Sequence, residues 1–473
     1  YGEAIHGTSM KKFVNGRTVD MTLEYMKNLV AAGVDIFDVD LGCYDNWWLP
    51  HPPGSMPPGC FLEVARTVKE FFSANQIRSN AGAEVPVVGV GKLGYPDLAE
   101  AALRGRLCDM VMLGRPLLAD PEWPNKAYAG QVEDIRPCIG CQEGCLNEFV
   151  EGGHPQCAVN PRTAFEHVYP AAPPKAEASK RIAVVGAGPA GVVAAVTAAA
   201  RGHRVTLIEK SGKIGGRLIP GSVPKIKFDV DNYRLYLERQ VKKAEAAHGL
   251  TFLTGTEATA DWLADQRFDA VVVATGSADV RLDLPGAENA NIVQATELLM
   301  HPELAEGARY VAVIGGGVVG CETAFWLRQE LHKEVKVLEM TPVIMNHTCT
   351  ANRGHLIHTL HKNGVELLNC TRVTGFTPDG LLAVRNVSPT VPDPYDTWHP
   401  ILPENIENPL APRIKVEEQA ISLNADLIVL AAGGRADDAL FLEAQRRRVA
   451  PLVRQLGDSY QVGRVFEAVR AAY

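Results

Sequence analysis

One glycine-rich pattern occurs twice in this chain and restricts its fold more than any other feature. In RIAVVGAGPAGVVAAVTAAARGHRVTLIEK, a predicted strand runs into a glycine turn, a helix of small apolar residues follows, and a second strand ends in an acid. The same order returns in ARYVAVIGGGVVGCETAFWLRQELHKEVKVLEM. In such a unit the first glycine makes a tight turn, the second admits a pyrophosphate, the third lets the helix pack on the strand, and the acid binds ribose hydroxyls. The sequence therefore predicts two dinucleotide-binding units.

Each copy is followed by an apolar strand that ends in small residues, FDAVVVATGS and ADLIVLAAGGR, as expected where a backbone passes close to a cofactor. Two such copies indicate a pair of domains like those of dinucleotide-dependent disulfide reductases, one for FAD and one for a nicotinamide nucleotide. A carboxylate at Glu339 would repel a 2′-phosphate and so favours NADH, although Lys336 nearby leaves NADPH open. The pattern residues are Gly186, Gly188, Gly191 and Glu209 in the first copy, and Gly315, Gly317, Gly320 and Glu339 in the second.

The composition is that of a globular enzyme. The 473 residues, of which 46% are hydrophobic and 22% charged, suffice for about three domains. A net charge of −8 disfavours nonspecific binding of nucleic acid. The chain has no apolar run near the ~20 residues that span a bilayer, and YGEAIHGTSM lacks the apolar core of a signal peptide. We therefore expect a cytoplasmic protein without a nucleic-acid or membrane partner.

The first part of the chain alternates helical patterns with three apolar strands, VDIFDVDLG, VPVVGVG and CDMVMLGR, which is typical of a parallel sheet. Gly91 and Lys92 follow the second strand, and Gly114 and Arg115 follow the third. In a (β/α)8 barrel the loops after the last two strands commonly bind the phosphate of a cofactor. The alternative is that they are two glycine turns with surface charges.

Three strands cannot close a barrel. The chain also begins at Tyr1 without an initiator methionine. We therefore expect that earlier residues were removed, are disordered or come from another subunit, unless the barrel interpretation is wrong.

The stretch CYDNWWLPHPP begins where the first of these strands ends, on the face where such barrels build active sites. Tyr44, Trp47, Trp48 and His51 are therefore candidates to line a substrate pocket. The alternative is that the two tryptophans pack the loop and that the histidine has a structural role. No catalytic residue can be assigned.

Four cysteines lie close together in RPCIGCQEGCLNEFVEGGHPQC. Cys138, Cys141, Cys145 and Cys157 have the spacing C-x2-C-x3-C-x11-C. Four thiolates suit either a [4Fe-4S] cluster or a tetrahedral zinc ion. Zinc ribbons usually have two C-x2-C knuckles and this segment has one, while disulfides are not expected in the cytoplasm.

The sequence resembles the Old Yellow Enzyme-like flavoproteins that are extended by FAD and nucleotide domains. This group includes 2,4-dienoyl-CoA reductase, 2-enoate reductase and trimethylamine dehydrogenase. The likeness is carried, in family order, by GRPLLADPEWPNK, IRPCIGCQEGC, CAVNPRTAFE, VVGAGPAG, GGRL and GDSYQVGRVFEAVRAAY. GCYDNWWLPHPPGSMPPGCF is most similar to the 2-enoate reductase branch. The family's first five barrel strands, with its proton donor and the groups around the flavin ring, have no counterpart here.

The resemblance implies an α/β fold that begins with the C-terminal part of a (β/α)8 barrel. The implied divisions are a partial TIM barrel for FMN and substrate (1–135), a [4Fe-4S] segment (136–170), the first part of an FAD-binding Rossmann-like domain (171–285), an NAD(P)H-binding domain (286–425) and the return of the FAD domain (426–473).

The resemblance also implies where four cofactors bind: FMN, FAD, a [4Fe-4S] cluster and NADH. The FMN phosphate would contact Gly91, Lys92, Gly114 and Arg115, and the cluster would bind Cys138, Cys141, Cys145 and Cys157. FAD would contact Gly186, Gly188, Gly191, Glu209, Gly216, Arg217, Thr275, Gly276, Gly457 and Asp458. The nicotinamide nucleotide would contact Gly315, Gly317, Gly320 and Glu339.

The implied activity is an NADH-dependent ene reductase. Electrons would pass from NADH through FAD and the cluster to FMN, and then to an activated C=C bond of a 2-enoate or of an enoyl or dienoyl-CoA. One alternative is an electron-transfer module for a partner chain that carries the rest of the barrel. Another is an amine dehydrogenase, which the second glycine pattern argues against. Besides the small-molecule substrate, we expect a homo-oligomer or a partner chain that completes the barrel.

Overall fold

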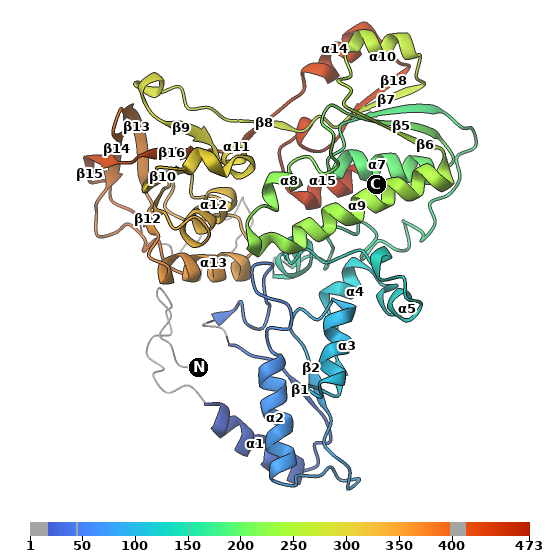
Figure 1. The fold of residues 1–473 in the computed structure, drawn as a ribbon, viewed down its shortest axis with the longest axis vertical. Coiled ribbons are helices and arrows are strands. Elements are labelled where there is room, and N and C mark those ends of the chain that lie inside the picture. The colour runs from blue at the N-terminus through green and yellow to red at the C-terminus, as the bar shows by residue number, and fades with distance from the viewer. Residues whose placement is uncertain (1–17, 44–45, 151, 398–412) are drawn as a thin grey trace.

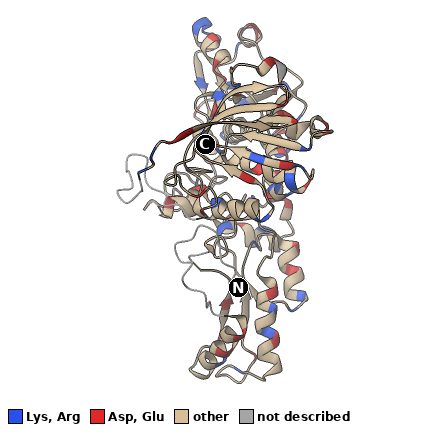
Figure 2. Ribbon diagram, turned by 90° about the vertical axis from the view of Figure 1, so that its left-hand side faces the viewer, with Lys and Arg blue, Asp and Glu red and all other residues tan. Residues whose placement is uncertain are grey.

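The computed structural model describes residues 18–43, 46–150, 152–397 and 413–473. Figure 1 shows an N-terminal unit below two larger α/β units, with a connecting segment at the junction. Here the N-terminal unit denotes residues 18–135, the connecting segment 136–170, the first nucleotide unit 171–285 with 431–473, and the second nucleotide unit 286–430. Figure 2 shows acidic and basic residues interspersed along the ribbon of the described residues.

The N-terminal unit contains a three-stranded parallel sheet in the order β1-β2-β3. The three strands coincide with the three that the sequence predicts, and buried side chains such as Val87 and Phe72 join the sheet to its helices. The described strands form an open sheet, so the closed barrel stays a prediction. The elements are α1 (Val19–Ala31), β1 (Phe37–Val39), α2 (Leu62–Ala74), β2 (Val87–Gly89), α3 (Pro96–Arg104), β3 (Met110–Val111), α4 (Arg115–Ala119), α5 (Trp123–Tyr128) and η2 (Val132–Asp134).

The connecting segment has little regular structure. A π-helical turn, η3 (Glu143–Asn147), leads into the short helix α6 (Glu148–Val150). Cys145 lies within η3, and residues 152–156 before Cys157 form neither helix nor strand.

The first nucleotide unit is built on a five-stranded parallel sheet in the order β18-β7-β4-β5-β6. Helices α7, α9 and α15 cover one face, and α10 and α14 cover the other. The C-terminal strand β18 pairs with β7, so the end of the chain returns to this unit. The elements are β4 (Arg181–Val185), α7 (Pro189–Ala200), β5 (Arg204–Glu209), α8 (Leu218–Gly221), η4 (Lys225–Lys227), α9 (Phe228–His248), β6 (Leu250–Thr254), α10 (Ala260–Gln266), β7 (Ala270–Val273), α14 (Ala439–Arg447), β18 (Leu452–Gln455), η7 (Gly457–Ser459) and α15 (Val465–Ala472).

The second nucleotide unit repeats this plan with a parallel sheet in the order β12-β11-β10-β16-β9 and an antiparallel sheet β13-β14-β15. A two-stranded ladder of β8 and β17, both within the bounds of the first unit, lies at the connection to the second. The elements of the ladder and of the second unit are β8 (Ser277–Asp279), η5 (Ala287–Asn289), β9 (Ile292–Gln294), α11 (Ala295–Met300), η6 (Pro302–Ala305), β10 (Tyr310–Ile314), α12 (Val318–Gln329), β11 (Glu334–Leu338), α13 (Thr350–Lys362), β12 (Glu366–Leu368), β13 (Thr371–Thr377), β14 (Gly380–Asn386), β15 (Glu418–Asn424), β16 (Leu427–Leu430) and β17 (Gly434–Ala436).

The structure corrects one predicted boundary. Strand β16 lies between β10 and β9 in the second sheet, although the sequence interpretation assigns residues after 425 to the FAD domain. The second unit therefore extends to residue 430, because its sheet needs this returning strand.

None of the described helices combines the length and the apolar character needed to cross a membrane.

Candidate functional site

The first glycine pattern has the geometry that its sequence predicts. Gly186 has a φ of 105°, and a Cβ there would overlap the carbonyl oxygen of Ala274. A Cβ at Gly191 would overlap the carbonyl oxygen of Gly186, so only glycine lets α7 lie this close to the turn. A Cβ at Gly188 would meet no atom within 4 Å. The open space at the start of α7 suits a pyrophosphate, which the helix N-terminus favours.

The second pattern repeats these contacts around α12. Gly315 has a φ of 110°, and a Cβ there would overlap the carbonyl oxygen of Ala431. A Cβ at Gly320 would overlap Gly315, whereas one at Gly317 would again meet no atom within 4 Å. We call the open space at each glycine turn, Gly186–Gly191 in the first copy and Gly315–Gly320 in the second, a dinucleotide cradle. Both cradles are formed in the structure.

The two predicted ribose-binding acids lie beside their glycine turns. Glu209, at the end of β5, accepts hydrogen bonds of 2.8 Å from the backbone N–H groups of Ala187 and Ser211. Glu339, directly after β11, accepts hydrogen bonds of 2.7 Å from the N–H groups of Gly316 and Thr341. Each carboxylate is held at the edge of the space that a bound nucleotide would enter.

The structure brings two charged residues of the predicted FAD set together. Arg217 donates to Asp279 and to the carbonyl oxygen of Ser277, both at 2.7 Å. Asp458 accepts hydrogen bonds from the Ser277 hydroxyl at 3.3 Å and the Gly463 N–H at 3.0 Å. Burial raises the pKa of Asp458, and these two hydrogen bonds partly oppose that rise.

The remaining residues of this set lie in tight turns. Gly216, Gly276 and Gly457 all have positive φ, and a Cβ at Gly216 would lie 3.0 Å from Gly188. The Thr275 hydroxyl donates to the carbonyl oxygen of Asp437 at 2.9 Å.

A cavity of about 550 Å³ separates the two nucleotide units, and we call it the central cavity. It is lined by Arg217 and Asp458 of the predicted FAD set, by Gly317 of the second cradle and by Cys141 of the connecting segment. A flavin ring and a nicotinamide ring would have to meet in such a shared space for hydride transfer.

An ion pair that the sequence interpretation missed lies on the central cavity. The ammonium group of Lys227 lies 2.6 Å from the carboxylate of Glu322. Glu322 is on α12, and both residues line the cavity. The signal in the sequence is an acid two positions after the third glycine, in the first turns of the helix that follows the glycine pattern.

The four clustered cysteines line one small cavity, which we call the cysteine cavity. All four are free thiols, so the structure does not contain the disulfide alternative. Burial raises the pKa of each thiol, that of Cys157 to about 12. Buried thiols that surround one space fit a metal group, because metal binding compensates the cost of deprotonating them.

Four thiolates at ~2.3 Å from one zinc ion would lie within ~4 Å of one another. Among the described residues, no group of three or more His, Cys, Asp or Glu, the four cysteines included, has the placement of metal ligands. The choice between a [4Fe-4S] cluster and zinc therefore stays a prediction.

The turn that carries the first cysteines is held from two other units. Gln142 has a φ of 62°, and its side-chain amide donates to the carbonyl oxygen of His51 at 2.5 Å. From α13, Asn352 donates to the carbonyl oxygen of Cys141 at 2.6 Å. Cys349, next to that helix, donates to the side-chain oxygen of Gln142 at 3.2 Å.

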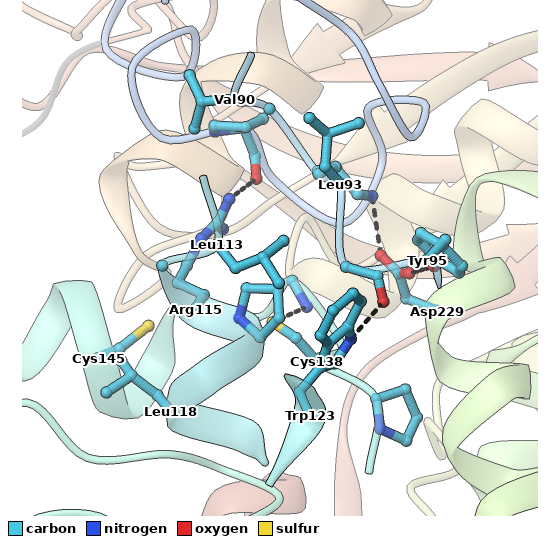
Figure 3. A pocket seen from close by; sticks show the side chains of 18 of the residues that line it. Val90, Leu93, Tyr95, Leu113, Arg115, Leu118, Trp123, Cys138, Cys145 and Asp229 are labelled. Atoms are coloured by element: carbon cyan, nitrogen blue, oxygen red, sulfur yellow. Dashed lines mark hydrogen bonds and ion pairs between the residues drawn. The ribbon is translucent and has the colours of Figure 1, made fainter. Parts of the chain in front are cut away.

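A second large cavity, of about 520 Å³, lies between the N-terminal unit, the connecting segment and α9, and we call it the front cavity. Figure 3 shows it with Arg115 and Cys145 on one side and Tyr95 and Asp229 on the other. The predicted phosphate residues line it together, as do Cys138 and Cys145: the phosphate set is Gly91, Lys92, Gly114 and Arg115.

Arg115 fits an anion in the front cavity. One guanidinium nitrogen, Nη2, donates to the carbonyl oxygen of Pro52 at 2.7 Å. The other, Nη1, is buried and has no hydrogen-bond partner among the described residues. A buried charged donor without a partner is costly, and a phosphate group would satisfy it.

Lys92 does not fit the predicted phosphate contact. Its ammonium group donates to the carbonyl oxygens of Gly54 and Met56 at 2.7 Å and to Asp229 at 2.8 Å. These contacts use all three N–H donors of the ammonium group. In this arrangement the ammonium group has no N–H donor left for a phosphate and its charge is compensated by Asp229, so the phosphate contact of this side chain stays a prediction.

The predicted substrate loop is only partly at the front cavity. His51 lines that cavity, and its ring lies edge-on to Trp47 at 4.5 Å. Trp48 is 6% exposed, stacks on His358 of α13 at 5.3 Å and does not line the front cavity. Its indole instead packs the loop against the second nucleotide unit. Tyr44 lies outside the described residues.

Comparisons with known proteins agree with this architecture. Residues 180–451 match the family model of the pyridine nucleotide-disulphide oxidoreductases. The chain is 33% identical over 461 residues to cinnamate reductase of Clostridium sporogenes, covering 97% of this chain and 61% of that protein. It is 31% identical over 470 residues to NADH oxidase of Thermoanaerobacter brockii, covering 98% of this chain and 65% of that protein.

A solved complex of 2-naphthoyl-CoA reductase with 2-naphthoyl-CoA superposes on the chain with a TM-score of 0.79 at 28% identity, covering 96% of this chain and 62% of that one. The chain thus spans about three fifths of the length of the relatives it matches.

The fold and the two cradles define an oxidoreductase with two dinucleotide-binding units. The chain belongs to the pyridine nucleotide-disulphide oxidoreductase family, which implies FAD and NAD(P)H as cofactors. It is homologous to the FAD- and NAD-binding part of the Old Yellow Enzyme-like flavoproteins.

Proposed function

We propose that the chain belongs to an NADH-dependent ene reductase in which electrons pass from NADH to FAD, to a [4Fe-4S] cluster and to FMN. The observation that carries this proposal is the distribution of the cysteines. Cys141 lines the central cavity, Cys138 and Cys145 line the front cavity, and all four cysteines line the space between. A [4Fe-4S] cluster bound there would supply one-electron transfer between a flavin in each large cavity.

The residues of the chain have separate tasks in this proposal. Arg115 would neutralise the FMN phosphate through its unpartnered nitrogen. Glu209 and Glu339 would bind the ribose groups of FAD and NADH, and the negative charge of Glu339 favours NADH over NADPH. The pair of Lys227 and Glu322 would orient the nicotinamide end in the central cavity.

The proposed substrate is a 2-enoate or an enoyl or dienoyl-CoA thioester. Cinnamate reductase and 2-naphthoyl-CoA reductase, the relatives described above, act by name on a conjugated acid and on an aromatic thioester. Besides Arg115, the front cavity is lined by Arg136, Arg239 and apolar side chains, which suit such an anion.

A second candidate is an electron-transfer module for a partner that carries the substrate site. The open sheet of the N-terminal unit favours it, because strands β1 and β3 both lie at sheet edges among the described residues. An amine dehydrogenase is less supported, because the second cradle is fully formed.

The deciding experiment is anaerobic purification followed by metal and flavin analysis and EPR spectroscopy after addition of NADH. We expect about four iron atoms, one FAD and one FMN per chain, and a reduced-cluster signal. NADH oxidation that depends on an added enoate, with loss of one C=C bond, would establish the ene reductase. NADH-dependent flavin reduction that leaves every tested enoate unchanged would favour the electron-transfer module, and zinc in place of iron would contradict both.

A further inference from the structure

A buried ion pair joins the N-terminal unit to the first nucleotide unit. Lys92 follows β2, and Asp229 is the second residue of α9. Their side chains are 6% and 3% exposed, and Nζ lies 2.8 Å from Oδ2. The hydroxyl of Tyr95 donates to the other carboxylate oxygen, and Nζ also lies 4.5 Å from the centre of the Phe228 ring. Both oxygens of Asp229 are thus held by residues of the other unit.

The loop of Lys92 is shaped for this contact. Gly91 and Lys92 have φ values of 107° and 53°, so two consecutive residues lie in the left-handed region. A lysine adopts that conformation only when the surrounding structure compensates the strain. The compensation here is the set of three hydrogen bonds to Gly54, Met56 and Asp229. Because an unpaired buried charge is strongly destabilising, the loop and α9 depend on each other.

The pair also closes the front cavity. Gly91 and Arg115 line it from the N-terminal unit, Cys138 from the connecting segment, and Asp229 and Asn232 from α9. A movement of α9 away from the N-terminal unit would open the cavity and would change the position of Cys138 relative to it.

We propose that Lys92, Tyr95 and Asp229 are positioning residues. Their contacts, which we call the lock, hold the N-terminal unit against the first nucleotide unit at the front cavity, and so fix the position of the two flavins relative to each other. This inference rests on the proposed function for the identity of the two flavins. The lock itself follows from the contacts between the units.

The test compares Asp229→Asn, Lys92→Met and the double variant K92M/D229N in the purified holoenzyme. The lock predicts that each single change weakens FMN binding and slows NADH-dependent reduction of FMN by at least about tenfold. The double variant should be no more impaired than the more impaired of the two single variants. Reduction of ferricyanide by NADH, which needs only the two dinucleotide cradles, checks that the nucleotide units are intact.

The matched control is Lys243→Met. Lys243 of α9 pairs with Asp134, but its side chain is 54% exposed, so the lock predicts no change in FMN binding or in FMN reduction.

A direct phosphate contact by Lys92 gives a different pattern and would overturn the proposal. In that case Asp229→Asn frees the ammonium group and keeps or tightens FMN binding, and only Lys92→Met weakens it.

If the wild-type protein binds no FMN, the proposed function fails, and the lock is then judged from thermal unfolding and limited proteolysis. The lock predicts one unfolding transition in the wild type and, in either single variant, a separate earlier transition with faster cleavage of the N-terminal unit. A single transition that is unchanged in both variants contradicts the lock.

Discussion

The glycines of the second cradle differ in what a methyl group would meet. At Gly320 it would overlap the backbone of Gly315, whereas at Gly317 it would enter open space. The absence of a side chain at Gly320 therefore allows α12 to pack against the turn, whereas the absence of one at Gly317 leaves space for a bound nucleotide.

We predict that Gly320→Ala and Gly317→Ala have opposite signatures. Gly320→Ala should destabilise the second nucleotide unit by about 1–3 kcal/mol, because the helix must move away from the turn. Gly317→Ala should leave the melting temperature nearly unchanged but raise the KM for NADH at least about tenfold. Thermal unfolding and NADH-dependent ferricyanide reduction measure the two effects. Equal melting temperatures for the two variants would contradict the prediction.

The charge of Glu339 gives a prediction on cofactor choice. Glu339→Gln keeps an oxygen for one of the two N–H groups, Gly316 or Thr341, places an NH2 group at the other, and removes the negative charge. The ratio of kcat/KM for NADH to that for NADPH should fall about tenfold, which corresponds to ~1.4 kcal/mol.

The control for this experiment is Lys336→Met, because the ammonium group of Lys336 already pairs with Glu366 at 2.7 Å. It should leave the ratio within about twofold of the wild type. A larger effect from Lys336→Met than from Glu339→Gln would show that the cation, and not the acid, sets the preference.

Local sequence signals predicted the cradle residues, because each glycine acts on neighbours within its own strand-turn-helix unit. The roles of Lys92 and Glu322 could not be predicted in this way. Their partners, Asp229 and Lys227, are separated from them by 137 and 95 positions, and no local pattern encodes which distant charge meets which. For Trp48, apolar character was evident, but the surface that it covers was not.

At the scale of elements, helix α13 joins three parts of the molecule. It belongs to the second nucleotide unit, contacts the cysteine turn through Asn352, and packs on the substrate loop through His355 and His358. Nδ1 of His355 lies 2.7 Å from the hydroxyl oxygen of Ser55. From the sequence, no element is predicted in this stretch, and the buried face of α13 contains an arginine and a glycine as well as leucines.

His355 makes this junction sensitive to acid. Burial lowers its pKa to about 4, with smaller contributions from His358 and Lys92. The folded state therefore binds fewer protons than the unfolded state between pH 6.5 and 4, and its stability falls as the pH drops through that window. We expect the titration of His355 to lower the free energy of unfolding by about 2 kcal/mol at pH 5 relative to pH 7.5.

Urea unfolding at pH 7.5 and pH 5, followed by tryptophan fluorescence, measures this loss. In His355→Gln the difference in free energy of unfolding between pH 7.5 and pH 5 should be smaller by that amount, because glutamine does not titrate. The same pH dependence in both proteins would show that His355 is protonated without disturbing the junction.

At the scale of the whole molecule, the order of units along the chain was predictable, because the second glycine pattern repeats the first. It was not predictable which of the two sheets each of the last strands joins. Strand β16 returns to the second sheet and β18 to the first, and both are segments of only four residues with no local signal for one sheet over the other. Nor could spacing alone show that the four cysteines face three different cavities, because that depends on how the connecting segment is held between the units.

The position of Cys141 leads to a prediction for the intact molecule. Cys141 lines the central cavity, so under the proposed function Cys141→Ser should remove the proposed cluster ligand nearest to the proposed FAD site and lower iron content about 10- to 100-fold. NADH should still reduce ferricyanide, since both cradles are unchanged, but the reduction of FMN should slow at least about 100-fold because no carrier connects the two large cavities.

The exposed Cys43 offers a matched control, and Cys43→Ser should retain both iron and FMN reduction. Stopped-flow absorbance and iron analysis provide both readouts. Normal FMN reduction in an iron-free Cys141→Ser protein would mean that the flavins exchange electrons directly, and the cysteine cavity would then have a structural task rather than a place in the electron path.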